Sequence, residues 1–192
     1  MNFDFDDEEF ERDVKIKVVG VGGGGGNAVE NMVRNNVEGV DFIIINTDVA
    51  ALKSKDGNTM ERVQIGRKTT KGRGAGGKPP VAAESAKENS DDIAEVLKGA
   101  SLVFVAAGMG GGTGTGAAPV IAQIAKDMGI LTVGVVTKPF DFEREFKMNL
   151  ALQGIAELRK FVDALIIVPN QRLLSIKEKN ISIKAAYAMV DN

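Results

Sequence analysis

The sequence of 192 residues contains no cysteine, no histidine and no tryptophan, and only 5% of its residues are aromatic. Disulfides, Cys/His metal sites, thiol nucleophiles and imidazole bases are therefore excluded. A chain without cysteine fits a reducing compartment, so we expect a cytoplasmic protein. The first residues are acidic, which is not the pattern of a signal peptide, and no apolar run approaches the roughly 18 residues of a membrane span. We therefore expect no direct membrane insertion.

Net charge is also small, because 24 basic residues nearly balance 26 acidic ones. The sequence thus has no broad basic field, and nucleic acid is not an expected partner. A hydrophobic fraction of 44% is typical of soluble globular proteins, and the length allows one domain with a sizeable core. Residues 1–13 carry seven acidic side chains and a single arginine, which predicts a disordered acidic arm before a domain over residues 14–192.

Glycine, in contrast, is abundant, and most of the 23 glycines fall into three clusters. The clusters are Gly20 with residues 22–26, then residues 72–77, and then residues 108–116. Each cluster is expected to lie in a loop that follows a strand. Ligands of parallel α/β sheets bind at the carboxyl ends of the strands, so the three clusters could converge on one ligand.

The hydrophobic pattern predicts strands that alternate with helices. We expect strands at residues 14–19, 40–46, 62–65, 101–107, 130–136 and 163–168. We expect helices at residues 27–36, 80–97, 117–128 and 143–160, with two further helical stretches at the end of the chain. This alternation predicts a three-layer, Rossmann-like α/β fold, with a mostly parallel sheet of about six strands and helices on both faces.

The third cluster has the pattern of a phosphate-binding loop. It reads GMGGGTGTG, between an apolar strand and an expected helix. Glycine has no Cβ, so backbone N–H groups can surround an anion, and a helix N-terminus adds unpaired donors. Thr113 and Thr115 add hydroxyls that can donate to phosphate oxygens.

The other motifs leave alternatives open. Gly20, Gly22 and Gly25 match G-x-G-x-x-G, which with Asp48 also suits an NAD(P)-binding oxidoreductase domain or a tight strand–helix turn. The middle cluster fits G-x-x-x-x-G-K, but Pro79 stands where a P-loop needs Ser or Thr. We therefore reject a P-loop ATPase, and the segment is either a surface loop or a loop that closes over a terminal phosphate.

Several polar residues have an ordinary structural interpretation beside a functional one. Asn46-Thr47-Asp48 follows a strand, so it forms either an Asx turn or helix cap, or a group beside phosphate-bound Mg²⁺. Glu143 and Lys147 have the i, i+4 spacing of an exposed ion pair.

The run GGGTGTG at residues 110–116 resembles the signature of the tubulin/FtsZ family. Further matching segments cover most of residues 14–192, namely VGVGGGGGN at 19–27, NTD at 46–48, GRGAG at 72–76, GVVTKPF at 134–140 and IVPN at 167–170. The resemblance implies the GTP-binding domain of a filament-forming GTPase that builds the bacterial division ring. It implies GTP or GDP as ligand, with Mg²⁺ held mainly by the phosphates and not by a protein metal site.

The resemblance also implies a role for each matching residue. The diphosphate would be lined by Gly23, Gly24, Gly25, Gly26 and Asn27. The α- and β-phosphates would be wrapped by Gly110, Gly111, Gly112, Thr113 and Gly114. Ala75 and Gly76 would sense the γ-phosphate. Glu143, with Lys147 beside it, would hold the ribose, and Asn170 would approach the ribose or guanine. Tyr187, otherwise a core aromatic, would stack on the base, and Asp191 would accept from the guanine N1–H and amino group.

Three residues depart from the family pattern: Lys147 replaces Arg, Arg144 replaces Gly and Gln171 replaces Asp. The Lys lacks the planar fork of Arg, which would weaken nucleotide binding.

The family's catalytic acids lie on a later loop that reaches the GTP of the next subunit, and that loop is not among these 192 residues. The catalytic residues are therefore unknown. We expect this chain to bind GTP, to hydrolyse it negligibly alone, and to be monomeric or to cap filaments that the intact protein forms. A non-catalytic structural or regulatory module on the same fold is the other alternative.

Overall fold

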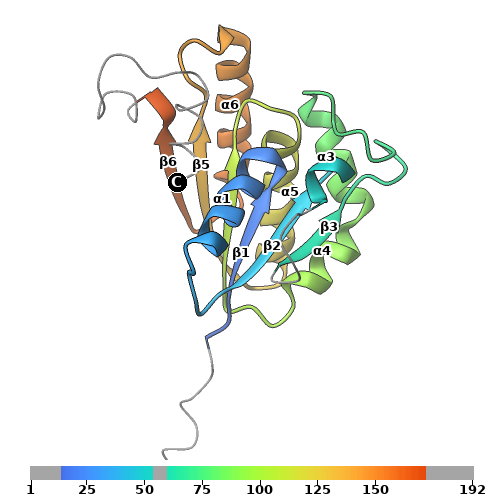
Figure 1. The fold of residues 1–192 in the computed structure, drawn as a ribbon, viewed down its shortest axis with the longest axis vertical. Helices are drawn as coiled ribbons and strands as arrows, with labels where there is room; N and C mark the ends of the chain where they lie inside the picture. The colour runs from blue at the N-terminus through green and yellow to red at the C-terminus, as the bar shows by residue number, and fades with distance from the viewer. Residues whose placement is uncertain (1–13, 54–59, 172–192) are drawn as a thin grey trace, which may run out of the picture.

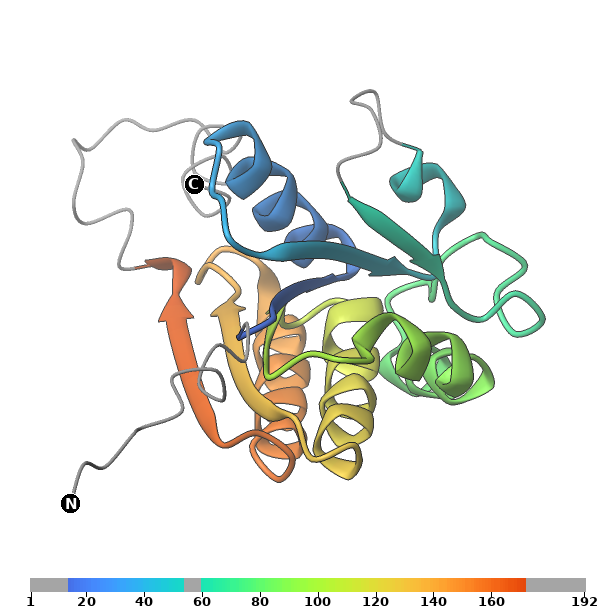
Figure 2. The same ribbon diagram turned by 90° about the horizontal axis from the view of Figure 1, so that it is seen from below.

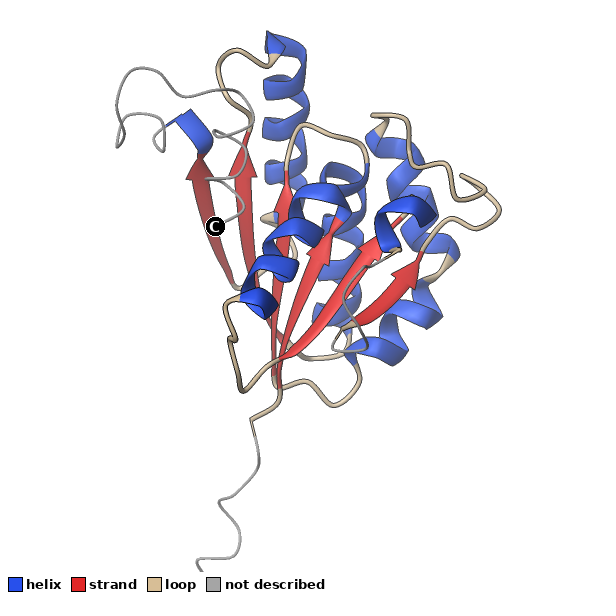
Figure 3. Cartoon of the chain, viewed as in Figure 1, coloured by secondary structure: helices blue, strands red, loops and turns tan. Residues whose placement is uncertain are grey.

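The computed structural model describes residues 14–53 and 60–171. Six strands form one sheet in the order β3-β2-β1-β4-β5-β6, and every neighbouring pair is parallel. The strands are β1 Ile16–Val21, β2 Asp41–Asn46, β3 Glu61–Gln64, β4 Leu102–Gly108, β5 Leu131–Lys138 and β6 Ala164–Pro169. Their carboxyl ends meet at one edge of the sheet, as the arrowheads in Figure 3 show.

Helices cover both faces of this sheet (Figures 1 and 2). They are α1 Gly22–Arg34, α2 Val49–Leu52, α3 Pro79–Glu88, α4 Ser90–Leu97, α5 Thr113–Asp127 and α6 Arg144–Leu158. Helices α1 and α2 lie on one face, and α3 to α6 lie on the other. The expected three-layer α/β fold is thus confirmed.

The hydrophobic core occupies both faces of the central strands. On β1, Val19 and Val21 belong to the larger cluster, on the side of α5, while Val18 packs with Val29 of α1 and Phe42 in a smaller cluster. Successive side chains of a strand point to opposite faces, so a continuous apolar run buries both. Each fully buried aliphatic side chain contributes about 1.5–3 kcal/mol of burial free energy.

Two helices begin earlier than the sequence pattern predicts. Helix α1 begins at Gly22 instead of residue 27, and α5 begins at Thr113 instead of residue 117. Gly22 has a φ of +72°, which glycine adopts without the steric cost that a Cβ would impose, and it turns the chain directly from β1 into α1. The glycines after β1, expected to form a loop, therefore form the first turn of α1. The glycine loop after β4 is shorter than expected, because α5 begins at Thr113.

The helix expected over residues 80–97 is broken at Asn89, where α3 ends and α4 begins. Asn89 has non-helical dihedral angles, and its side chain bonds to two other parts of the chain. Asn side chains compete with the helical backbone in this way. The short helix α2 is not predicted by the pattern at all. The expected acidic arm and the final helical stretches lie outside the described residues.

Candidate nucleotide-binding site

The site lies where the strand order reverses. From β1 the chain proceeds outward to β2 and β3, whereas from β4 it proceeds the other way to β5 and β6. Strands β1 and β4 are adjacent, with Val21 opposite Ala107 at their carboxyl ends. A crevice at such a switch point is where open α/β sheets bind ligands. Both strands lead into helices whose first turns are rich in glycine.

The two helix N-termini meet closely, and glycine permits it. A Cβ on Gly22 would lie 2.9 Å from the Gly114 nitrogen, and a Cβ on Gly114 would lie 2.5 Å from the Gly108 oxygen. The N-cap residues, Val21 and Gly112, make no side-chain cap hydrogen bond in the described chain. Neither first turn contains an acidic residue. The first backbone N–H groups of both helices are thus available to an anion, and both helix dipoles favour one.

The glycines at residues 23–26 divide into two kinds. Gly23 and Gly24 are exposed at the start of α1, whereas Gly25 and Gly26 are buried. A Cβ on Gly25 would overlap the carbonyl oxygen of Ala106, and one on Gly26 would lie 3.3 Å from Ile44. The buried pair therefore lets α1 pack on the sheet, and the exposed pair is open to a ligand. Asn27 is exposed on the following turn.

The loop between β4 and α5 is held in shape by its own threonine. Gly110 has a φ of +101°, and its N–H donates to the Thr115 hydroxyl at 2.9 Å. The Met109 N–H donates to the Thr137 carbonyl of β5 at 3.0 Å. Gly111 is exposed, and apart from its two chain neighbours no described residue comes within 4 Å of where its Cβ would be. Thr115, expected to contact phosphate, is thus buried and positions the loop.

The middle cluster reaches the same place. A Cβ on Gly112 would lie 3.1 Å from the Ala75 Cβ and from the Gly77 nitrogen, so this loop contacts the start of α5. Ala75 is buried and Gly76 is exposed. The Gly74 N–H donates to the Thr47 carbonyl at 3.2 Å. The three glycine clusters therefore do come together at one edge of the sheet.

Asn46, Thr47 and Asp48 adopt the ordinary structural arrangement. The Asn46 Oδ1 accepts from the Asp48 N–H at 3.2 Å, which is an Asx turn, and the Asp48 Oδ1 accepts from the Ala50 N–H at 2.8 Å to cap α2. Thr47 adds a contact that the sequence did not reveal: its hydroxyl lies 2.8 Å from that of Thr113 at the start of α5. Its position directly after β2 was the only available signal.

Glu143 lies at the N-cap position of α6, on the same edge. One carboxylate oxygen accepts from the Phe140 N–H at 3.0 Å, and the other accepts from Lys147 Nζ at 2.9 Å. The Glu143 side chain is only 10% exposed, whereas that of Lys147 is 49% exposed. The Glu143 carboxylate is therefore largely shielded from solvent, and its ion pair with the more exposed Lys147 fixes its orientation.

Two residues follow β6. Asn170 is 5% exposed, and its Oδ1 is buried without a hydrogen-bond partner among the described residues. Gln171 Oε1 accepts from the Asp141 N–H at 3.3 Å, which joins the end of β6 to the loop before α6. A buried acceptor without a partner is costly, so Asn170 suits a ligand donor. Tyr187 and Asp191 lie outside the described residues.

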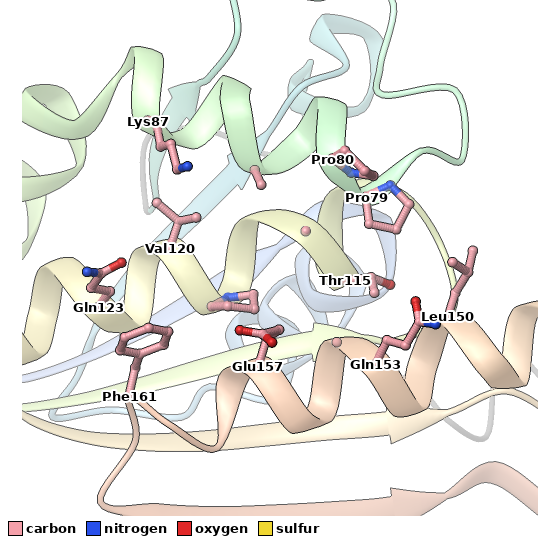
Figure 4. A pocket seen from close by; sticks show the side chains of 14 residues that line it. Pro79, Pro80, Lys87, Thr115, Val120, Gln123, Leu150, Gln153, Glu157 and Phe161 are labelled. Atoms are coloured by element: carbon pink, nitrogen blue, oxygen red, sulfur yellow. The ribbon is translucent and has the colours of Figure 1, made fainter.

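Two cavities flank the glycine loops. The larger, of about 580 Å³, lies between α1 and the strands β4 to β6, and is lined in part by Gly24, Gly108, Thr137 and Val168. Its volume is in the range of small-molecule sites. The other, of about 430 Å³, lies between α3, α5 and α6 on the opposite face of the sheet (Figure 4). Only the larger one opens beside the exposed glycines of α1.

Within residues 14–53 and 60–171, no group of three or more Asp, Glu, His or Cys side chains could hold a metal ion. The same residues include no helix long and apolar enough to cross a membrane.

A doubly wound parallel sheet with glycine-rich helix N-termini at its switch point defines a Rossmann-like nucleotide-binding domain. Residues 15–178 match the model of the Tubulin/FtsZ family, GTPase domain, and the chain therefore belongs to this family.

The relatives agree with this assignment. The chain is 55% identical over 166 residues to the cell division protein FtsZ of Wigglesworthia glossinidia brevipalpis and to that of Pseudomonas aeruginosa. These matches cover 86% of the chain but only 42–43% of each relative, so the chain spans less than half their length. A solved FtsZ dimer from M. jannaschii superposes with a TM-score of 0.88 at 40% identity, over 93% of this chain and 51% of the other. CetZ2 of Haloferax volcanii, solved as a GTPγS-bound protofilament, gives 0.79 at 26% identity, over 92% and 55%.

Proposed function

We propose that this chain is the guanine-nucleotide-binding part of a filament-forming cell-division GTPase. The observation that carries the proposal is the meeting of two glycine-rich helix N-termini at the β1/β4 switch point, without side-chain caps in the described chain. Backbone donors and two converging helix dipoles make a site for a diphosphate. Hydrogen bonds to a charged group contribute about 1.5–3 kcal/mol each.

In this proposal the phosphates lie along both helix starts. Gly23 and Gly24 face the diphosphate from α1, while Gly111, Gly112 and Thr113 face it from the β4–α5 loop. Ala75 and Gly76 close the site at the terminal phosphate, since their loop already contacts Gly112. In this proposal Mg²⁺ is carried mainly by the phosphate oxygens.

The nucleoside would lie beyond the carboxyl ends of β5 and β6, next to the 580 Å³ cavity. Glu143 and Asn170 follow these two strands but do not line the cavity itself. Glu143, oriented by Lys147, accepts from ribose hydroxyls, and the unpartnered Oδ1 of Asn170 accepts from the ribose or the base. Tyr187 stacks on the base and Asp191 reads the guanine N1–H and amino group, a pairing that adenine cannot offer.

The proposal is tested by calorimetric titration of the purified chain with GTP, GDP, ATP and NADH in Mg²⁺ buffer. We expect binding of GTP and GDP, and not of ATP or NADH. Tight binding of NADH would instead favour the oxidoreductase alternative, and no binding by a folded chain would refute the site.

Two substitutions probe the phosphate site without disturbing the fold. Gly23→Ala and Gly111→Ala each place a methyl group where, apart from its immediate neighbours in the chain, no described atom lies within 4 Å, so neither should clash with other parts of the protein. Both should reduce GDP affinity by about tenfold or more, which is a loss of about 1.4 kcal/mol. Ser101→Ala, an exposed position at the opposite edge of the sheet, is the matched control and should bind normally.

A further inference from the structure

The loop over residues 66–78 is held at its beginning by the last residue of α3. Glu88 Oε1 accepts from the Lys68 N–H at 2.8 Å, and its Oε2 accepts from the Thr69 N–H at 3.0 Å and from the Thr69 hydroxyl at 2.7 Å. One carboxylate thus holds three donors of a loop 19 and 20 residues away in sequence.

Asn89 adds a fourth bond at the break between α3 and α4. Its Oδ1 accepts from the Gly66 N–H at 2.8 Å, and its Nδ2 donates to Asp92 at 2.8 Å, which fixes the orientation of the amide. We call Glu88 and Asn89 together the α3 clamp. The helix is interrupted at Asn89, and the side chains of Glu88 and Asn89 both form hydrogen bonds with the loop at this point.

The middle of the loop is tied to the sheet edge that carries the proposed nucleotide site. The Thr70 hydroxyl donates to the Thr47 carbonyl at 3.2 Å, and the Gly72 carbonyl accepts from the Val49 N–H at 3.1 Å. Thr47 in turn contacts Thr113 at the start of α5. A continuous series of hydrogen bonds therefore runs from Glu88, through the loop, to the proposed phosphate site.

Hydrogen bonds from the loop, more than its positive charge, stabilise the ionised carboxylate of Glu88. Residues 66–78 contain five basic side chains and no acidic one. The N–H groups of the loop, first that of Lys68, hold the pKa of Glu88 below its ordinary value. The clamp is thus a charge-assisted contact with its acid ionised at neutral pH.

We infer that Glu88 and Asn89 are positioning residues that hold the 66–78 loop with Ala75 and Gly76 against the glycines of α5, and so set the preference for nucleoside triphosphate over diphosphate. The inference rests on the proposed function. A loop that is already ordered loses less conformational entropy when a terminal phosphate binds under it. In the proposed site only the terminal phosphate meets Ala75 and Gly76, so the affinity for a diphosphate should not depend on the clamp.

The first experiment follows amide hydrogen exchange without nucleotide in the wild type, Glu88→Ala and Glu88→Gln. Faster exchange is expected at residues 66–70 in Glu88→Ala, with strand amides unchanged. Glu88→Gln keeps one acceptor oxygen and should rescue part of the protection. Glu84→Ala, one turn earlier on the exposed surface of α3, is the matched control and should exchange like the wild type. Unchanged exchange in Glu88→Ala would overturn the clamp.

The second experiment measures the affinities of the same variants for a non-hydrolysable GTP analogue and for GDP. Glu88→Ala should weaken binding of the analogue about tenfold and leave GDP within about twofold. If Glu88→Ala weakens both nucleotides equally, or weakens neither, the ratio of the two affinities is unchanged. Either result would leave a merely structural role and overturn the inference. If the wild type binds neither nucleotide, the proposed function itself is refuted. If the wild type binds both and Glu88→Ala leaves their ratio unchanged, only the role of the α3 clamp is refuted.

Discussion

At the scale of single residues, the glycines of this domain perform two different tasks. Gly20, Gly25 and Gly116 are sites where a Cβ would overlap backbone oxygen atoms of neighbouring elements, so they permit close packing. Gly23 and Gly111 have open space around the position of a Cβ within the described chain. Packing does not require glycine at this second kind of position, which agrees with a ligand that approaches the backbone.

This distinction predicts opposite effects on stability. Gly25→Ala should lower the free energy of unfolding by about 1–3 kcal/mol or more, because α1 must move away from the Ala106 carbonyl. Gly23→Ala should leave it unchanged or raise it by up to about 1 kcal/mol, since alanine has the higher helix propensity. Urea denaturation of the two variants without nucleotide measures both values. Equal destabilisation would contradict the division into two kinds of glycine.

Asn170 allows a second test at this scale. Its buried Oδ1 has no partner among the described residues, so replacing it costs no protein hydrogen bond at that atom. Asn170→Ala should therefore change the unfolding free energy by less than about 1.5 kcal/mol. It should nevertheless weaken GDP binding about tenfold. Thermal unfolding with and without GDP gives both quantities, and a variant that is unstable but binds normally would remove Asn170 from the site.

At the scale of elements, the strands follow from the sequence, whereas the two glycine-rich helix starts do not. The six apolar runs place the strands within two residues of their observed bounds, because burial on both faces demands such runs. Glycine has low helix propensity, so residues 22–26 read as a loop, although they form the start of α1. Packing on the sheet outweighs that propensity.

The same limit applies to the site. The convergence of the three glycine clusters could be predicted from topology alone, because parallel strands that follow one another through helices end at the same edge of the sheet. Glu88, by contrast, reads in sequence as an ordinary solvated acid on a helix. Its contact with residues 68 and 69 depends on where the 66–78 loop runs, and no local pattern encodes that path.

The lowered pKa of Glu88 gives a pH prediction for the α3 clamp. A carboxyl whose folded pKa lies below its ordinary value of 4.5 contributes stability that is fully present above that value and is lost as the pH falls through the folded pKa. Exchange at residues 66–70, corrected for its intrinsic pH dependence, should thus be constant from pH 7 to pH 5 and rise in more acidic solution. In Glu88→Gln this rise should be absent. A change centred near neutral pH would exclude Glu88 as the titrating group.

At the scale of the whole molecule, the proposed nucleotide site lies at the carboxyl ends of the strands. Among the described residues, few acidic side chains at this edge could activate water. Asp48 caps α2 and Glu143 is bonded to Phe140 and Lys147, so these two acids at this edge already have structural partners. The chain spans less than half the length of the relatives it matches. The partners of Asp48 and Glu143 agree with what the family resemblance implies, that the acids that activate water come from a neighbouring subunit.

If hydrolysis needs acids from a neighbouring subunit, nucleotide binding and nucleotide hydrolysis can be separated in this polypeptide. The purified 192-residue chain should bind GTP yet release phosphate near the uncatalysed background rate. The family resemblance implies that this chain caps filaments. In substoichiometric amounts it should therefore shorten the filaments of a full-length relative. A Gly111→Ala chain, impaired in nucleotide binding, should shorten them less. Steady turnover by the chain alone would show that hydrolysis needs no second subunit, and unchanged filament length in electron micrographs would exclude capping.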